Sequence, residues 1–246
     1  MIPKEIRACV LDLDGVITDT ASVHAAAWTR MFDDFLGSRP KASGEDLRPF
    51  EPDDYRRYVD GKPRYDGVKS FLESRGISIP YGSPEDTPEL ETICGLGNRK
   101  NAEFQRHLDE NGVKVFPDTI AFVSGLHKRG IRTAVISASR NCLPVLRAAG
   151  VEDLFETRVD GVVAAELGLP GKPDPAVFLE AAKRLGAAPD QTAIVEDALA
   201  GVEAGRRGKF ALVIGVDRTG HGDDLLENGA TVVSNDLAQL LEEKAP

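Results

Sequence analysis

Short apolar runs alternate with segments of helical periodicity along much of this chain. The runs cover residues 8–13, 133–136, 192–195, 210–214 and 231–233. Each run is too short for a helix and has the composition of a buried strand. Regular alternation of such strands with helices predicts an α/β fold, a Rossmann-like doubly wound parallel sheet covered by helices on both faces.

The helical segments between these runs end near glycines, which commonly terminate helices. The segments cover residues 120–128, 143–149, 176–185 and 199–206. The terminating glycines are Gly130, Gly150, Gly186 and Gly208. The second half of the chain, joined by the strand near the N-terminus, therefore supplies the predicted sheet and its helices.

The stretch of residues 18–112 has a different pattern. Helical segments follow one another there without clear strands, at residues 23–36, 67–74 and 96–108. We therefore predict an α/β core domain of residues 1–17 and 113–246, interrupted by an inserted α-helical cap domain of residues 18–112. Within this insert, residues 77–95 are rich in proline, glycine and acids, which predicts a loop.

The formal net charge of -10 constrains the class of partner. Nucleic acids and anionic membranes are bound through clustered positive charge, so we expect neither as a partner. The N-terminal sequence places acidic residues within a short apolar stretch, which fits neither a secretory signal nor a membrane span. Cys9, Cys94 and Cys142 lack the spacing of a disulfide framework or a zinc site. We expect a cytoplasmic protein that is a monomer, with a homodimer as the alternative.

Polar residues cluster directly after three of the apolar runs. They are Asp12, Asp14, Ser137, Ala138, Ser139, Asn141, Glu196 and Asp197. Ligands of open parallel sheets bind at the carboxyl ends of the strands, so we expect these residues to form one site. Lys172, within Gly-Lys-Pro-Asp-Pro, precedes another helical segment and is a candidate for the same site.

Four acids in this set would repel one another in a partly dry cleft. A divalent cation among Asp12, Asp14, Glu196 and Asp197 would offset the repulsion, and oxygen-only ligands indicate Mg²⁺. A metal in such a site implies an anionic substrate. Hydroxyl, amide and backbone N–H groups after the second run, together with the Lys172 ammonium, are suited to bind phosphate. The candidate phosphate-binding residues there are Ser137, Ala138, Ser139 and Asn141.

The motifs D-L-D-G-V-I-T-D-T, S-A-S-R-N, K-P-D-P and V-E-D-A-x-x-G occur in this order along the chain. Together they resemble the motifs of the haloacid dehalogenase superfamily. The T-D-T sequence followed by His24 and Trp28, with the serine-alanine-serine motif, is similar to the beta-phosphoglucomutase branch. The resemblance extends from residue 12 to about residue 205.

The resemblance implies that Asp12 is a nucleophile that becomes an aspartyl phosphate. It also implies that Asp14 is the general acid and base toward a sugar hydroxyl. A carboxylate nucleophile divides the transfer between two hydroxyls into two displacements. By the same resemblance, Asp12, Glu196 and Asp197 hold Mg²⁺ with the backbone carbonyl of Asp14.

The resemblance assigns further roles around the substrate. Ser137, Ala138 and Lys172 match positions near the transferring phosphoryl group, and Asn141 matches one near the substrate. In the insert, Arg64 resembles an arginine that binds the non-transferring phosphate, a task suited to a guanidinium.

Three further residues match family positions that help to align the acid/base residue. These are Thr20, His24 and Lys100. The chain departs from the family pattern at Asp60, where the family has a cap lysine, and Lys62 is a possible substitute. This departure affects the expected orientation of the sugar.

The resulting hypothesis is a sugar-phosphate mutase that interconverts beta-glucose 1-phosphate and glucose 6-phosphate. Its expected intermediate and activator is glucose 1,6-bisphosphate, and its cap is expected to exclude water from the aspartyl phosphate. A phosphatase acting on small sugar phosphates is the alternative, because the same groups hydrolyse the intermediate when water enters. A non-catalytic module that binds phosphosugars is the remaining alternative.

Overall fold

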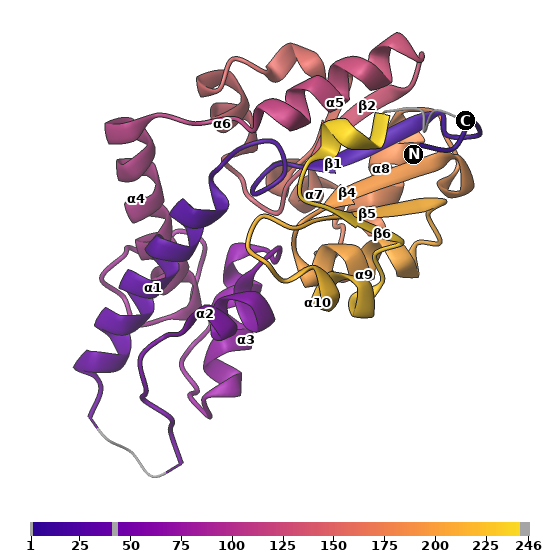
Figure 1. Cartoon of the computed structure of the whole chain (residues 1–246). Coiled ribbons are helices and arrows are strands. Elements are labelled where there is room, and N and C mark those ends of the chain that lie inside the picture. Colours follow the sequence, from indigo (N-terminus) through magenta and orange to yellow (C-terminus); the bar gives the residue numbers. More distant parts are fainter. Residues whose placement is uncertain (1, 41–43, 242–246) are drawn as a thin grey trace. The chain divides into compact units, whose positions relative to one another are not determined.

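The computed structural model describes residues 2–40 and 44–241 (Figure 1). The chain divides into two compact units, one formed by Met1–Thr20 with Val113–Pro246 and the other by Ala21–Gly112. Residues 18–20, which the sequence pattern assigned to the insert, belong to the first unit. Thr18 explains this boundary, because it forms isolated β-bridges with Asp14 and with Val115.

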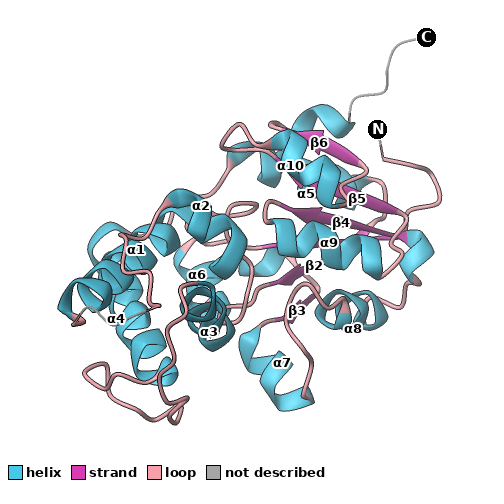
Figure 2. Cartoon of the chain, turned by 90° about the horizontal axis from the view of Figure 1, so that it is seen from below, coloured by secondary structure: helices cyan, strands magenta, loops and turns pink. Residues whose placement is uncertain are grey.

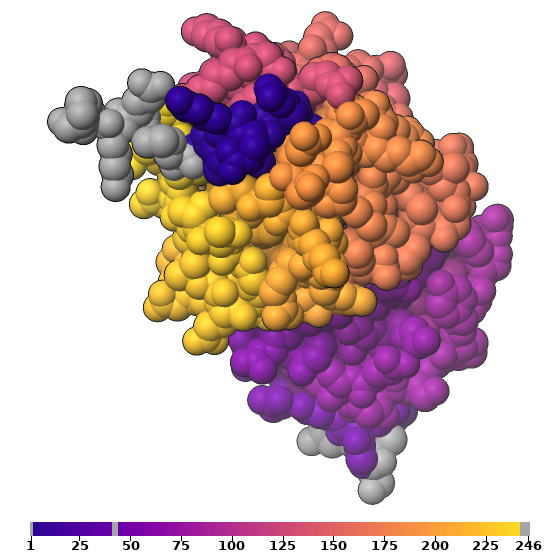
Figure 3. Space-filling view, turned by 90° about the vertical axis from the view of Figure 1, so that its right-hand side faces the viewer, coloured from indigo at the N-terminus to yellow at the C-terminus, as the bar shows by residue number. Residues whose placement is uncertain are grey.

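The first unit contains a six-stranded sheet in the order β3-β2-β1-β4-β5-β6, and every strand pair is parallel (Figure 2). The strands are β1 (Ala8–Asp12), β2 (Arg132–Ile136), β3 (Thr157–Val159), β4 (Thr192–Glu196), β5 (Leu212–Val216) and β6 (Val232–Ser234). The predicted doubly wound α/β class is confirmed. In the space-filling view, the N-terminal segment lies among atoms from the second half of the chain, as a central β1 requires (Figure 3).

Helices cover both faces of this sheet. They are α5 (Pro117–Lys128), α6 (Cys142–Ala148), α7 (Gly161–Leu167), α8 (Ala176–Arg184), α9 (Leu199–Arg207) and α10 (Gly222–Asn228). On one face, Phe178 of α8 and Val202 of α9 pack in a core with Val10 of β1. Figure 1 shows α5 on the opposite side of the sheet from α9 and α10. Side chains alternate along each strand, so each face has its own apolar set.

The elements that the sequence pattern missed are short. Strand β3 spans three residues at the edge of the sheet, and only Val159 of them is buried. An edge strand with one buried residue has no apolar run to mark it. Helices α7 and α10 have seven residues each, and they bury none and one of them, so neither has a clear apolar stripe.

Helix α9 ends at the predicted C-cap glycine, Gly208, but this glycine is not left-handed. Gly130, Gly150 and Gly186 have left-handed φ angles of 72°, 67° and 64°, but Gly208 has a φ of -74°. The left-handed residue is Lys209, with a φ of 55°. A side chain at position 208 would meet Pro175 at 3.0 Å and overlap Phe210, so close packing accounts for the glycine there.

The second unit is helical in its described residues. Its elements are α1 (Ala21–Ser38), α2 (Pro52–Asp54), the π-helix η1 (Tyr55–Val59), α3 (Arg64–Ser74) and α4 (Ile93–Asn111). Its apolar core includes three packed phenylalanine rings, with Phe32 lying 4.2 Å from Phe71 and 5.0 Å from Phe50 between ring centroids. No helix in the described part of either unit is long and apolar enough to span a membrane.

Replacing Lys209 by glycine should stabilise the protein. A left-handed conformation costs a residue with a Cβ atom about 1 kcal/mol, and glycine avoids that cost. We expect Lys209→Gly to raise the free energy of unfolding in urea by about 1 kcal/mol. The matched control is Gly130→Ala, which should lower it by a similar amount because the site has open space and a positive φ. An unchanged or lower stability for Lys209→Gly would contradict this explanation.

Candidate active site

The ends of three neighbouring strands bring polar side chains together at one edge of the sheet. Asp12, the last residue of β1, pairs with Ile136 of β2, so Ser137 directly follows that pair. On the other side, Leu11 pairs with Val195 of β4, and Glu196 follows. Because all three strands run in the same direction, their carboxyl ends coincide. The predicted convergence of these residues follows from the register.

A buried ammonium group joins two of these acids. Lys172 Nζ donates a hydrogen bond to Asp12 Oδ1 at 2.5 Å and another to Glu196 Oε1. Lys172 and Asp12 are each 5% exposed, and Glu196 is fully buried. Backbone groups satisfy the remaining oxygens, since Asp14 N donates to Asp12 Oδ2 and Ala198 N donates to Glu196 Oε2, both at 2.9 Å.

Burial and charge oppose each other in setting the pKa of these groups. Burial raises the pKa of the Asp12 carboxyl; Lys172 opposes this effect, and Glu196 and Asp14 add to it. Burial alone would lower the pKa of Lys172, but the charges of Asp12 and Glu196 outweigh it and raise that pKa. Lys172 is therefore held as a cation beside Asp12.

A chain of hydroxyl groups orients Asp14. Thr20 Oγ1 donates to Asp14 Oδ1, and Ser137 Oγ donates to Asp14 Oδ2 at 3.2 Å. Thr18 Oγ1 lies 2.8 Å from Thr20 Oγ1 and 3.2 Å from the carbonyl oxygen of Leu13. With its one proton, Thr18 can donate to Thr20, which in turn donates to Asp14, and such chains strengthen each bond.

Thr18 was not among the residues singled out from the sequence. It is fully buried and acts on Asp14 through Thr20. The T-D-T motif contains both threonines, but they meet where the isolated bridge at Thr18 passes into a turn at residues 19 and 20. The sequence pattern did not specify that turn.

The loop after β2 is shaped by its own hydroxyl groups and by α7. Ser137 Oγ accepts from Ser139 N at 3.0 Å, and Ser139 Oγ accepts from Asn141 N at 3.1 Å. Gly161 N donates to the Ser139 carbonyl at 3.2 Å. A Cβ atom at Gly161 would lie 2.7 Å from the Ala138 carbonyl oxygen, so only glycine lets α7 begin this close to the loop.

Two glycines leave room for the carboxylates of Asp197 and Glu196. A Cβ atom at Gly15 would overlap the carboxylate of Asp197, which therefore lies against the loop that follows Asp12. A Cβ atom at Gly201 would overlap the carboxylate of Glu196. Both carboxylates thus occupy space that a side chain at position 15 or 201 would fill.

The carboxylates of this site are of the donor type that divalent cations bind. Asp12, Asp14, Glu196 and Asp197 contribute carboxylates, whereas the cation that contacts Asp12 and Glu196 is Lys172. Among the described residues, no three histidine, cysteine or acidic side chains are grouped as a metal site. Oxygen-only donors in excess over the ammonium match the preference of Mg²⁺.

Apart from Thr20, the predicted site residues of the insert lie in the second unit, where two of them contact each other. Lys100 Nζ is hydrogen-bonded to His24 Nδ1 and lies 5.1 Å from the Trp28 ring centroid. The His24 ring stacks on Phe104 at 4.0 Å. These contacts place His24, Lys100 and Trp28 in one cluster.

The other predicted residues of the insert lie on α3 or just before it. Arg64 begins α3, and its Nη1 donates to Asn98 Oδ1 at 3.3 Å. Lys62, the possible substitute for the family's cap lysine, donates to Ser70 Oγ at 2.9 Å. Lys62 is therefore directed to the helix that follows it.

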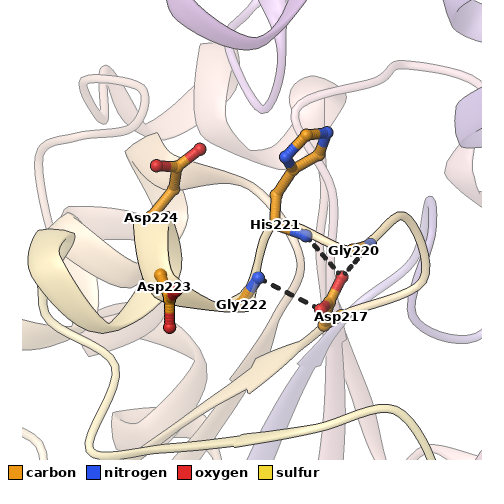
Figure 4. Close-up of a pocket in the computed structure, with 6 residues that line it drawn as sticks. All are labelled: Asp217, Gly220, His221, Gly222, Asp223 and Asp224. Carbon is orange, nitrogen blue, oxygen red and sulfur yellow. Dashed lines mark hydrogen bonds between the residues drawn. The ribbon is translucent and has the colours of Figure 1, made fainter.

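A separate pocket lies in the first unit beyond the end of β5 (Figure 4). Its lining residues are Asp217, Gly220, His221, Gly222, Asp223 and Asp224, none of which was a candidate from the sequence. The Asp217 carboxylate accepts from the backbone N–H groups of Thr219, Gly220, His221 and Gly222. Burial opposes ionisation of Asp217, but these four bonds outweigh it and lower its pKa. The Asp217 carboxylate therefore stabilises the loop that carries these N–H groups.

Removing the Lys172 charge should destabilise the first unit. Lys172→Met would leave the buried carboxylates of Asp12 and Glu196 without their common cation. Breaking a buried ion pair in this way costs about 3 kcal/mol or more. We expect that loss in urea unfolding at neutral pH in the presence of EDTA, whereas Lys183→Met, at a side chain that is 80% exposed, should change little. A loss below about 1 kcal/mol for Lys172→Met would contradict the assigned role.

Comparison with known proteins agrees with this geometry. The family model described as haloacid dehalogenase-like hydrolase matches residues 6–209. A beta-phosphoglucomutase of Mycobacterium bovis is 48% identical over 98% of this chain and 93% of its own length. A beta-phosphoglucomutase of Bacillus subtilis is 32% identical over 90% of this chain and 88% of its own.

A solved structure of the same family has a similar fold. The crystal structure of a beta-phosphoglucomutase from Clostridium difficile matches with a TM-score of 0.74 and 26% identity, covering 96% of this chain and 93% of that one. Sequence, family model and fold therefore agree on one assignment. The chain belongs to the haloacid dehalogenase superfamily, in its beta-phosphoglucomutase-like family.

Proposed function

We propose that this protein is a beta-phosphoglucomutase that converts beta-glucose 1-phosphate to glucose 6-phosphate. The observation that carries the proposal is the buried Asp12 carboxylate, which contacts the Lys172 ammonium and lies two residues before an Asp14 held by hydroxyl groups. This arrangement supplies a nucleophile, a cation and an acid/base residue. The 48% identity to the mycobacterial enzyme supports the same substrate.

The reaction proceeds in two phosphoryl transfers. In the first, the phosphoryl group on Asp12 passes to the 6-hydroxyl of beta-glucose 1-phosphate; the bond between phosphorus and Asp12 breaks, and the hydroxyl proton goes to Asp14. In the second, Asp12 attacks the 1-phosphoryl group of the resulting glucose 1,6-bisphosphate. The sugar oxygen leaves with the proton from Asp14, which gives glucose 6-phosphate and restores phosphorylated Asp12.

The contacts around Asp12 and Asp14 suit these steps. Lys172 offsets negative charge beside the transferring group, which is where electrostatic stabilisation lowers the barrier most. Thr20 and Ser137 fix both oxygens of Asp14, so the proton acceptor is oriented before the substrate binds. Hydrogen bonds of Ser139 and Asn141 fix the loop after β2, whose backbone is proposed to lie near the phosphoryl group.

Mg²⁺ is the proposed cofactor. The side chains of Asp12, Glu196 and Asp197 would hold it, with the backbone carbonyl of Asp14. When bound, the ion neutralises charge on the transferring phosphoryl group. The excess of carboxylates over ammonium groups in this part of the first unit supports the proposal.

The residues of the insert would bind and align the substrate. Arg64 is the proposed ligand of the non-transferring phosphate, for which its planar guanidinium is suited. His24 and Lys100 are proposed to help align Asp14. The contact between His24 and Lys100, packed among Trp28 and Phe104, supports a common role.

Phosphorus NMR tests this function directly. The wild-type protein is mixed with beta-glucose 1-phosphate, Mg²⁺ and a trace of glucose 1,6-bisphosphate, and the products are followed in time. We expect glucose 6-phosphate with little inorganic phosphate, and a rate lower by roughly a thousandfold or more for Asp12→Ala, because the nucleophile is absent. Stoichiometric inorganic phosphate would replace the mutase assignment by the phosphatase alternative.

Two further arms of this experiment test its separate parts. EDTA should abolish product formation, and added Mg²⁺ should restore it. Unchanged turnover in EDTA would remove the metal from the proposal. Turnover that is unchanged in Asp12→Ala would exclude this nucleophile and require another catalytic group. No turnover by the wild-type protein would leave the non-catalytic binding module.

A further inference from the structure

We propose that Asn98 is a positioning residue that holds Arg64 in place for the substrate's non-transferring phosphate. The inference rests on the proposed function, in which Arg64 is the ligand of that phosphate. Asn98 lies in the first half of α4, and its side chain makes four hydrogen bonds within the second unit. Asn98 thereby links Arg64 and Tyr65 to the loop between α3 and α4.

The two ends of the Asn98 amide have different partners. Asn98 Oδ1 accepts from Arg64 Nη1 at 3.3 Å and from the Tyr65 hydroxyl at 3.0 Å. Asn98 Nδ2 donates to the carbonyl oxygens of Pro84 and Asp86 at 3.0 Å and 2.8 Å. The reversed amide would set its NH₂ group against the Arg64 N–H donor and its oxygen against two carbonyls. The loop carbonyls therefore determine that the amide oxygen faces Arg64.

Two glycines of α4 make this contact possible. A Cβ atom at Gly97 would lie 2.8 Å from the Tyr65 ring and 3.1 Å from Arg64 Cγ. A Cβ atom at Gly95 would overlap the carbonyl of Leu90 and lie 3.1 Å from that of Thr87. The start of α3 and the loop therefore both pack directly on the backbone of α4.

The contacts of Arg64 restrict its guanidinium group. Its Cζ atom lies 5.4 Å from the centroid of the Tyr65 ring, and its Nη1 is bonded to Asn98. An arginine that is free to sample its rotamers loses that freedom when it binds an anion, which weakens binding. Holding Arg64 in advance removes part of that cost. Asn98 Oδ1 accepts from Nη1, which is one of the three nitrogens of the guanidinium fork.

This assigns a role to the loop of residues 77–92, which is otherwise unexplained. Arg99 Nε donates to the Pro88 carbonyl at 2.8 Å, and Thr92 Oγ1 donates to Asp86. Thr92 also accepts from Gly95 N at 2.9 Å as the N-cap of α4. The loop is thereby fixed to α4 at several points, and it provides the carbonyls that orient Asn98.

The test compares Asn98→Ala in the wild-type and Arg64→Ala backgrounds, using the full chain. The substrates are glucose 1,6-bisphosphate, which carries a second phosphate, and acetyl phosphate, which does not. Loss of a hydrogen bond to a charged group corresponds to about a tenfold change or more. We expect Asn98→Ala to raise KM for the bisphosphate by about tenfold, with kcat and acetyl phosphate turnover unchanged within about twofold. In the Arg64→Ala background it should have no further effect.

The matched control is Asn111→Ala, at the exposed last residue of the same helix, which should leave all these values unchanged. An equal loss from Asn98→Ala in both backgrounds, or with both substrates, would overturn the proposal and make Asn98 a general structural residue. An unchanged KM would also overturn it. If the wild-type protein only hydrolyses its substrates, the mutase assignment fails, but the same comparison of KM values still decides the role of Asn98.

Discussion

The site in the first unit depends on one buried cation between two buried acids. Lys172 contacts both Asp12 and Glu196, and all three side chains are almost completely removed from water. Each charge alone would be strongly unfavourable at such a depth, and the group is tolerated because its charges are paired and hydrogen-bonded. The same arrangement keeps a carboxylate next to a cation at the end of a central strand. Structural stability and the proposed chemistry therefore rest on the same contacts.

The backbone determines where these charges can lie. Parallel strands β2, β1 and β4 end together, and Gly15 and Gly201 leave room for the carboxylates of Asp197 and Glu196. In the second unit, Gly95 and Gly97 have the same function for the loop and for α3. At Gly15, Gly95 and Gly201 the absence of a side chain allows a polar group to approach, and at Gly97 it allows the side chains of Arg64 and Tyr65 to approach. Glycines inside motifs are thus as informative about the site as the charged residues beside them.

The sequence predicted most reliably what depends on local pattern. The run of residues 8–13 predicted β1, and the acids after it predicted the edge where Asp12 meets Glu196. Strand β3 could not be predicted in this way, because an edge strand of three residues carries no periodic signal. Thr18 and Asn98 were missed for another reason. Thr18 acts through local hydrogen bonds to Leu13 and Thr20, which depend on the turn that joins these residues. Asn98 acts through hydrogen bonds to a loop whose position the sequence alone does not specify, such as the carbonyls of Pro84 and Asp86.

The most direct test of the central claim is to identify the residue that carries the phosphoryl group. The protein is mixed with glucose 1,6-bisphosphate, quenched in acid within one turnover, digested and analysed by mass spectrometry. The account predicts a phosphate that is labile to hydroxylamine on the peptide containing Asp12, and its loss in Asp12→Ala. A phosphorylated residue elsewhere in the chain, with Asp12 unmodified, would contradict the account.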